Sequence, residues 1–303
     1  MQFFLSRVLY TVVILPISKL PFRILYFISD IVYFILYHLV RYRKKVVHSN
    51  LCRSFPEKTS EEIKAIEKRF YKHFTDLLLE SFKLFSISEQ ELRERMIFEN
   101  TDLFQKFFDQ GKSVIVAGGH YGNWEMFAVA SQLYWKHQGV ALYKPLANHW
   151  FEQVMRETRG RYGLEMVPIQ KTKEFFNQPH PKPISTIFGM DQSPSKVKSS
   201  HWMEFLGQDT AVIYGTEKYA RTYQQPVVFG RIMKLNRGYY KTYFELVTDQ
   251  PDSMSHGAII EKVMRLLETD IKKEPEWWLW THRRWKHKKP AHSGIYNENN
   301  SAE

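Results

Sequence analysis

The chain has 303 residues, enough to bury the core of one large domain or two small ones. Its 43 Lys and Arg against 32 Asp and Glu give a formal net charge of +11, which favours an anionic partner such as nucleic acid, an acidic membrane surface or a phosphorylated substrate. A single cysteine, Cys52, excludes an intramolecular disulfide framework and a cysteine-rich metal site.

The first 45 residues predict a membrane anchor. Two apolar stretches, 3–17 and 22–40, contain few charges, and the second approaches the roughly 20 residues that a helix needs to cross a bilayer. Asp30 lies in the middle of the second stretch, so the segment is either a spanning helix or hairpin, or a helix that lies at the interface or packs on protein. The basic cluster 41–45 is typical of the cytoplasmic side, where we therefore place the rest of the chain.

The next segment predicts a long amphipathic helix. Thr59 and Glu62 form a capping box, and apolar side chains recur at helical spacing from there to about residue 86. Beyond it, short apolar strands alternate with helical segments, which predicts a layered α/β domain with an antiparallel pair at its edge over 226–248. We expect strands at 113–118, 140–144, 165–169, 184–190, 226–234 and 241–248, and helices at 124–136, 149–160, 211–223 and 256–272. The expected division is an anchor over 1–45, one domain over 46–288 and a disordered tail over 289–303.

Residues 118–125, GGHYGNWE, follow the first expected strand directly. Inside one helix, His120 and Glu125 would be separated by about 140° of rotation and could not share a face. We therefore place His120 in a glycine-rich loop, with Asn123 as the N-cap of a helix whose first turn holds Glu125.

The pair is predicted to form a dyad in which the Glu125 carboxylate fixes the tautomer of His120. The other ring nitrogen would then take a proton from an incoming nucleophile. Backbone amides at the start of the helix, near Gly119, are candidates for binding an anion or an oxyanion. As a bare pattern H-x4-E is weak, and a structural histidine is the alternative.

Competing catalytic motifs fail on spacing. No pair of histidines has the i, i+4 spacing of a zinc protease with a glutamate between them, and no G-x-S-x-G motif signals a serine nucleophile. Gly111, Lys112 and Ser113 resemble the end of a P-loop, but Lys106 stands where its first glycine is required. The nucleophile is therefore expected on the substrate, and neither a metal nor a cofactor is expected.

Several other groups of residues are candidates for substrate binding. Arg159 and Arg161 end a predicted helix, where they either complement the helix dipole or clamp an anion. Asp191 follows an apolar strand, which would carry it to the carboxyl edge of the sheet; a surface turn is the alternative. Phe205 and Gly207 either line an apolar groove or belong to the core.

The block 275–286 alternates aromatic residues with basic ones that include Arg283 and Arg284. Such a mixture can stack nucleic-acid bases, or it can suit a bilayer interface and phosphate headgroups. The hydrophobic N-terminus favours lipid.

Taken together, these pieces resemble the lipid A biosynthesis acyltransferases, the late acyltransferases of the lysophospholipid acyltransferase superfamily. The matching pieces run in family order over residues 1 to about 288: the basic stretch 43–50 with 51–57, the block 119–125, 143–145, Arg159 and Arg161, 191–192, 205–207, 275–276 and 282–286. Two departures are Trp285, where the family often has phenylalanine, and a polar, basic stretch over 192–204 that bears on the choice of acceptor.

The resemblance implies a glycerolipid-acyltransferase-like α/β domain on the cytoplasmic face of the bacterial inner membrane. It implies transfer of a fatty acyl group from acyl carrier protein or acyl-CoA to a hydroxyl of a phosphorylated glycolipid, with His120 and Glu125 as catalytic residues. Gly119, Asn123, Arg159, Arg161, Asp191, Phe205, Gly207, Arg283 and Arg284 are the expected substrate-binding residues. The expected partners are thus the acyl donor, the glycolipid and an anionic membrane, with no nucleic acid. An aminolipid or a phosphoinositide mannoside as acceptor, a membrane-tethered nucleic-acid-binding protein and an inactive scaffold are the alternatives.

Overall fold

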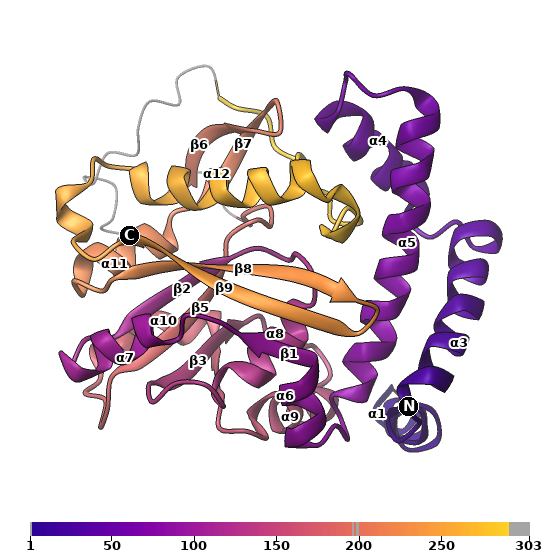
Figure 1. Ribbon diagram of the computed structural model, residues 1–303, viewed down its shortest axis with the longest axis horizontal. Helices are drawn as coiled ribbons and strands as arrows, with labels where there is room; N and C mark the ends of the chain where they lie inside the picture. Colours follow the sequence, from indigo (N-terminus) through magenta and orange to yellow (C-terminus); the bar gives the residue numbers. More distant parts are fainter. Residues whose placement is uncertain (1, 196, 198–199, 291–303) are drawn as a thin grey trace.

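A seven-stranded mixed sheet separates two layers of helices in the computed structural model, which describes residues 2–195, 197 and 200–290 (Figure 1). The strand order is β1-β9-β8-β2-β5-β3-β4, and the pairs are parallel except for β8 with β9. The strands are β1 (Met96–Phe98), β2 (Val114–Gly118), β3 (Gln138–Tyr143), β4 (Glu165–Pro168), β5 (Ile184–Gly189), β8 (Val227–Asn236) and β9 (Tyr239–Thr248). The predicted α/β class and the antiparallel pair over 226–248 are confirmed. The expected tail lies, beyond residue 290, outside the described residues.

Helices cover both faces of the sheet. Figure 1 shows α12 over one face, with a separate hairpin of β6 (Ser200–Phe205) and β7 (Gln208–Ile213) beside it, and α8 against the other face. The α-helices are α1 (Gln2–Leu9), α2 (Leu15–Ser18), α3 (Phe22–Phe34), α4 (Lys44–Ser54), α5 (Ser60–Lys83), α6 (Glu89–Arg95), α7 (Asp102–Asp109), α8 (Trp124–Ser131), α9 (His149–Gly160), α10 (Thr172–Asn177), α11 (Gly215–Thr222) and α12 (Ala258–Lys273). Two π-helical segments, η1 (Tyr10–Ile14) and η2 (Ile35–Leu39), and three 3-10 turns, η3 (Ile169–Lys171), η4 (Pro251–Ser253) and η5 (Pro275–Trp277), complete the elements.

The central strand β2 is buried on both faces, which explains its unbroken apolar sequence. Ile115 and Ala117 contribute to one core cluster, whereas Val114 and Val116 contribute to the other. Alternate side chains of a strand point to opposite faces, so a strand covered on both sides needs apolar residues throughout. β2 thereby carries the residues that follow it to the carboxyl edge of the sheet at a fixed position.

Helix α5 links the two cores, and its predicted capping box is confirmed. The Thr59 hydroxyl accepts from the Glu62 backbone N–H at 3.2 Å, and the Glu62 carboxylate accepts from the Thr59 N–H at 2.8 Å. Ile66 packs in the cluster on one side of the sheet and Leu79 in the other. Figure 1 shows α3 packed along the outer side of α5.

Two helix predictions differ from the structure. The helix expected at 211–223 begins only at Gly215, because 208–213 form β7. Leu206 and Gly207 connect β6 and β7 with φ of 51° and 70°, the backbone of a two-residue type I′ hairpin turn. The helix expected at 124–136 ends at Ser131, where Gln132 donates to the His137 carbonyl at 2.8 Å and turns the chain into β3.

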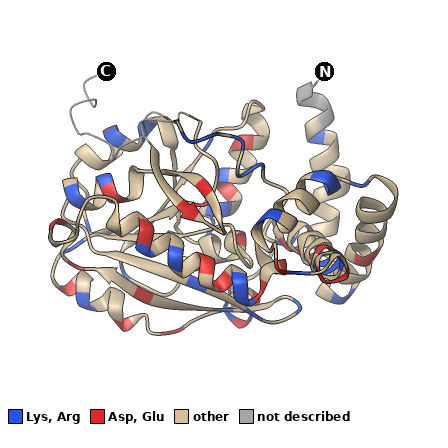
Figure 2. Ribbon diagram, turned by 90° about the horizontal axis from the view of Figure 1, so that it is seen from above, with Lys and Arg blue, Asp and Glu red and all other residues tan. Residues whose placement is uncertain are grey.

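The excess of basic residues is distributed over the molecule. In Figure 2, positions of acidic and basic residues alternate along the ribbon of several helices. Of the described helices, one continuous segment, Phe22–Leu39, is long and apolar enough to cross a membrane by length and composition.

Candidate active site

His120 and Asp191 lie side by side at the carboxyl edge of the sheet. β2 ends at Gly118 and β5 at Gly189, and these two glycines face each other in the parallel pairing of the strands. His120 follows β2 by two residues, and Asp191 follows β5 by two. In open α/β sheets the crevice outside the carboxyl ends of the strands is the usual place for a ligand.

The Asp191 carboxylate accepts three hydrogen bonds. His120 Nδ1 lies 2.7 Å from Oδ1, the His120 backbone N–H donates to Oδ2 at 2.9 Å, and Trp278 Nε1 donates to Oδ2 at 2.7 Å. The Asp191 side chain is 2% exposed, whereas the His120 side chain keeps 25% of its surface exposed. Asp191 is therefore held from three directions, and the imidazole still reaches solvent.

The electrostatics of the pair fix its protonation. Burial by itself would raise the pKa of Asp191, but the charge and hydrogen bonds of His120 and the Trp278 N–H lower that pKa to about 2. Burial by itself would lower the pKa of His120, yet Asp191, and more weakly Glu125, raise it above its ordinary value. Because Nδ1 faces a carboxylate, the neutral ring carries its proton there. Nε2 is then the acceptor, and the Gln192 amide donates to it at 3.1 Å.

The structure corrects the expected hydrogen bond between His120 and Glu125. Arg159 of α9 holds the Glu125 carboxylate at both oxygens, with Nη2 at 2.7 Å from Oε1 and Nε at 3.0 Å from Oε2. This two-point pairing is the geometry in which arginine binds carboxylates most strongly. Glu125 therefore affects His120 through its charge alone, and Asp191 is the residue that hydrogen-bonds Nδ1.

The turn that carries His120 is fastened from behind by α5. Asn123 caps α8 as predicted, since its Oδ1 accepts from the Met126 N–H at 2.8 Å. Its Nδ2 donates to Glu80 Oε2 at 2.7 Å, and the ring of His73 lies 3.3 Å from the Gly122 carbonyl oxygen. Asn123 is fully buried, so its side chain positions the turn and offers no surface to a substrate.

Gly119 and Gly122, two glycines of the turn that carries His120, are each required by close packing. A Cβ on Gly119 would lie 2.6 Å from the Leu267 side chain of α12 and 3.2 Å from the Asp191 carboxyl carbon. Gly122 has a φ of 60°, and a Cβ there would lie 2.7 Å from Ile232 Cγ2. Gly119 therefore permits the approach of Asp191 to His120, and Gly122 permits the reversal of the chain.

The backbone amides that follow Gly119 are already hydrogen-bonded within the protein. The His120 amide bonds Asp191, the Tyr121 amide donates to the Gly119 carbonyl at 2.9 Å, and the Gly122 amide donates to the Trp277 carbonyl at 2.9 Å. These three donors are not available for an oxyanion in this arrangement.

Besides Asn123, four of the expected substrate-binding residues have structural roles. Arg161 donates to the carbonyls of Phe85 and Ile87 and so ties α9 to the loop after α5. Phe205 is fully buried, and Gly207 occupies the hairpin turn. Arg284 is 2% exposed, donates to the Ala211 carbonyl at 2.7 Å, and burial lowers its pKa to about 10. By contrast, Arg283 is exposed.

The block 275–286, which suggested nucleic acid or lipid, instead supports the site. Trp278 is 2% exposed and Trp280 is fully buried. The backbone of Leu279 donates to the His120 carbonyl at 3.1 Å, and Tyr121 forms an isolated β-bridge with Trp278. Trp278 and Trp280, in the middle of this block, thus pack inside the protein. The backbone of the same segment holds the turn that carries His120 from the side of α12.

Sequence reasoning missed Trp278, Gln192, Glu80 and His73 as site residues. Asp191 itself was found from its place after an apolar strand. Trp278 lies in the block 275–286, whose composition suggested a surface for nucleic acid or lipid, and Glu80 lies in a long amphipathic helix, so neither residue carried a local signal of contact with His120 or its turn. Among the described residues, no cluster of three or more His, Cys, Asp or Glu side chains is arranged to hold a metal ion.

The fold and the site define a mixed α/β protein with a carboxylate-paired histidine at the carboxyl edge of its sheet, its second ring nitrogen turned away from the carboxylate. The sequence profile of the bacterial lipid A biosynthesis acyltransferase family matches residues 2–287. The chain belongs to this family and is an acyltransferase. It is 22% identical over 283 residues to the lipid A biosynthesis palmitoleoyltransferase of Escherichia coli K12, covering 92% of this chain and 90% of that protein. The same values relate it to the lipid A biosynthesis acyltransferase of Shigella flexneri.

Proposed function

We propose that the protein transfers a fatty acyl chain from acyl carrier protein, or from acyl-CoA, to a hydroxyl of a lipid A precursor at the cytoplasmic face of the bacterial inner membrane. Family membership supports the reaction class. The observation that carries the mechanism is the pairing of His120 Nδ1 with buried Asp191, which leaves Nε2 to act as a base.

In the proposed reaction, Nε2 of His120 takes the proton of the acceptor hydroxyl as its oxygen attacks the thioester carbonyl carbon. The tetrahedral intermediate then collapses, the carbon–sulfur bond breaks, and the thiolate of the donor takes the proton from the imidazolium. The acyl chain passes directly to the acceptor, and no covalent intermediate forms on the enzyme. Asp191 stabilises the imidazolium at Nδ1, and Glu125 adds a second negative charge nearby.

Gln192 and Arg159 are proposed to act on the substrates. The Gln192 amide occupies the position at Nε2 that the acceptor hydroxyl must take, so it moves aside or bonds the incoming oxygen. Arg159 uses Nε and Nη2 on Glu125, which leaves Nη1 for an oxyanion or for a phosphate of the acceptor. Positive charge beside developing negative charge is among the strongest catalytic contributions an enzyme makes.

The burial of Trp278 and Trp280 counts against the nucleic-acid alternative, because these two rings offer no surface on which a base can stack. An aminolipid or a phosphoinositide mannoside remains an alternative acceptor within the same chemistry.

The test is a turnover assay on detergent-solubilised protein with acyl–acyl carrier protein and a tetra-acylated lipid A precursor, the product being followed by mass. His120→Ala is compared with wild type and with His48→Ala, which removes an exposed histidine of α4. We expect a new acyl ester from wild type and His48→Ala, and a loss of about 10²–10⁴-fold in His120→Ala. Equal rates in all three proteins would refute the general base. Product formed only with another lipid acceptor would replace the lipid A precursor in the proposal.

A further inference from the structure

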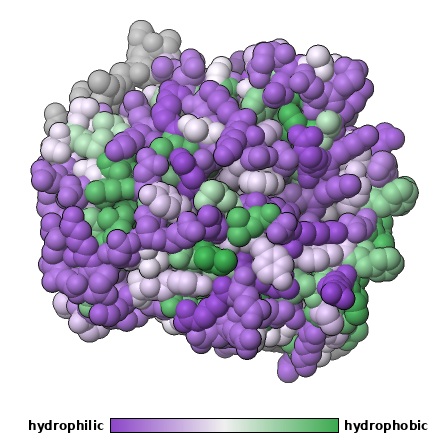
Figure 3. Space-filling model, viewed as in Figure 1, coloured by the Kyte–Doolittle hydropathy of each residue, from purple (hydrophilic) through white to green (hydrophobic). Residues whose placement is uncertain are grey.

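The outer face of α3 is apolar and exposed to solvent. Ile24, Phe27, Ile31 and Phe34 are 46%, 67%, 46% and 55% exposed, and their spacing places them on one stripe of the helix. Figure 3 shows apolar surface along the edge of the molecule that α3 occupies in Figure 1. A contiguous stripe of this kind on one helix marks an interaction surface.

The opposite face of α3 is bound to the catalytic body by polar contacts at the middle of the helix. The Tyr26 hydroxyl donates to Glu80 at 2.9 Å, and the Ser29 hydroxyl donates to Asp76 at 2.8 Å. Ser29 is fully buried, so α3 is packed closely against α5 at this point. Tyr26 and Ser29 lie near the centre of the apolar segment 22–39, where a spanning helix would have the bilayer midplane.

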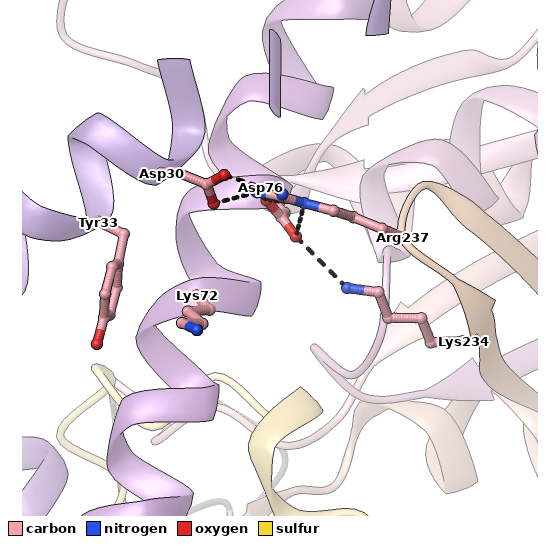
Figure 4. A pocket seen from close by; sticks show the side chains of 6 residues that line it. All are labelled: Asp30, Tyr33, Lys72, Asp76, Lys234 and Arg237. Atoms are coloured by element: carbon pink, nitrogen blue, oxygen red, sulfur yellow. Dashed lines mark hydrogen bonds and ion pairs between the residues drawn. The ribbon is translucent and has the colours of Figure 1, made fainter. Parts of the chain in front are cut away.

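A charged cavity of about 560 Å³ opens beside the same part of α3 (Figure 4). Arg237, from the turn between β8 and β9, bonds Asp30 of α3 at 2.7 Å and Asp76 of α5 at 2.7 Å. Lys234 lies 3.6 Å from Asp76, and Lys72 carries an exposed ammonium on the same wall. If α3 crossed a bilayer while packed as it is, this cavity and its charges would lie in hydrocarbon, which is costly for each ion.

The helical segment before α3 is also fastened to the body. Asn148, the N-cap of α9, donates to the Ser6 hydroxyl at 2.7 Å, and the Tyr10 ring packs at 5.5 Å from both Phe85 and Trp150. Neither apolar segment therefore projects away from the domain as a free spanning helix does. Their exposed side chains lie on its outer surface.

We infer that α3 lies along the membrane surface rather than across it. The stripe of Ile24, Phe27, Ile31 and Phe34 enters the acyl region of one leaflet, while the polar face stays on the catalytic body. The occupant of this surface is an anionic bilayer, because exposed cations border the apolar segments: Arg7, Lys19, Arg23, Arg41 and Lys45. An apolar face next to basic residues is the pattern of an interfacial helix.

The same arrangement connects the membrane to the active site. Tyr26 and Asn123 bond the two oxygens of the one Glu80 carboxylate, and Asn123 caps the helix that follows His120. Through these two hydrogen bonds to Glu80, α3 is connected to the turn that carries His120, the proposed base. The placement of α3 along the membrane surface goes beyond the proposed function. It rests on the proposed function only for the choice of the cytoplasmic leaflet.

The test measures from which side of the membrane a cysteine at position 19 is labelled. Lys19→Cys, in a Cys52→Ser background, replaces an exposed residue at the turn between α2 and α3, and wild-type Cys52, exposed on α4, reports the side of the catalytic domain. Each full-length protein is expressed in a Gram-negative host and treated with a membrane-impermeant maleimide in right-side-out and in inside-out vesicles. We expect both cysteines to react only in inside-out vesicles. Reaction of position 19 in right-side-out vesicles, or protection from both sides until detergent is added, would overturn the interfacial placement.

A second measurement tests the stripe itself without relying on turnover. Phe27→Glu and Tyr243→Glu each place a carboxylate at an exposed aromatic position, on α3 and on β9 respectively. We expect Phe27→Glu to weaken co-flotation of the purified protein with phosphatidylglycerol–phosphatidylethanolamine vesicles about tenfold or more, and Tyr243→Glu to leave it unchanged. Equal flotation of the two variants would contradict the proposal. Loss of turnover with normal labelling and flotation would count against the proposed function alone.

Discussion

Replacement of Asp191 by asparagine distinguishes the pairing seen in the structure from the dyad that the sequence suggested. Oδ1 accepts from His120 Nδ1, and Oδ2 accepts from the His120 backbone N–H and from Trp278 Nε1. Asparagine has one carbonyl oxygen, and placing it at the Oδ2 position keeps two of these three bonds. Its NH₂ group then faces Nδ1, so Nδ1 must become the acceptor and the ring proton moves to Nε2. His120 would keep its place but lose its lone pair toward the substrate.

The magnitude follows from the lost proton transfer. General-base help is worth about 10²–10⁴ in rate, or about 2.7–5.4 kcal/mol of activation free energy at about 1.36 kcal/mol per tenfold. The cost in folding free energy is smaller, about 1.5–3 kcal/mol for one hydrogen bond to a charged group, because the other two bonds persist. Asp191→Asn is therefore expected to remain folded and to lose at least ~10²-fold in kcat.

The assay compares kcat of Asp191→Asn with that of Glu125→Gln, which is isosteric and keeps an oxygen for Arg159. We expect the Glu125 variant to lose about tenfold or less, because Glu125 acts on His120 through space. Melting of each variant, followed by circular dichroism in the near and far ultraviolet, verifies that it is folded. If Asp191→Asn kept activity within about threefold of wild type while Glu125→Gln lost ~10²-fold, the orienting role would return to Glu125 and the reasoning would be wrong.

Three further predictions rest on the same region. Because only neutral His120 is a base and its pKa is raised, kcat/KM should fall as the pH drops through an inflection above 6.5; an inflection at or below 6.5 would contradict the influence of Asp191. Asn123→Ala removes an N-cap and a buried donor to Glu80, and denaturant titration should show a loss of about 1.5–5 kcal/mol in unfolding free energy. Gly122→Ala should cost more than Gly111→Ala, since both glycines have positive φ but a Cβ meets Ile232 only at Gly122; equal melting shifts would refute the packing argument.

The elements that the sequence predicted well are those encoded by neighbouring residues. The capping box of Thr59 and Glu62, the N-cap Asn123 and the apolar run of β2 each depend on contacts within one turn or one strand. The hairpin of β6 and β7 was misread because its turn signal, Leu206 followed by Gly207, lies among aromatic residues that also suit a groove. Within 275–286, the burial of Trp278 and Trp280 was not foreseen, because composition does not reveal which side of an aromatic segment is covered.

By itself, the sequence determined that a histidine would stand in a glycine-rich turn between a buried strand and a capped helix, because strand burial, turn glycines and helix capping are local properties. Tertiary structure alone decided which acid serves that histidine. Glu125 is five residues away, but Arg159 takes both of its oxygens. Asp191 is 71 residues away, yet the parallel register of β2 and β5, with Gly118 opposite Gly189, brings it to 2.7 Å from the ring. Pairing of distant strands fixes such distances, and nothing in the local sequence of either strand specifies its partner.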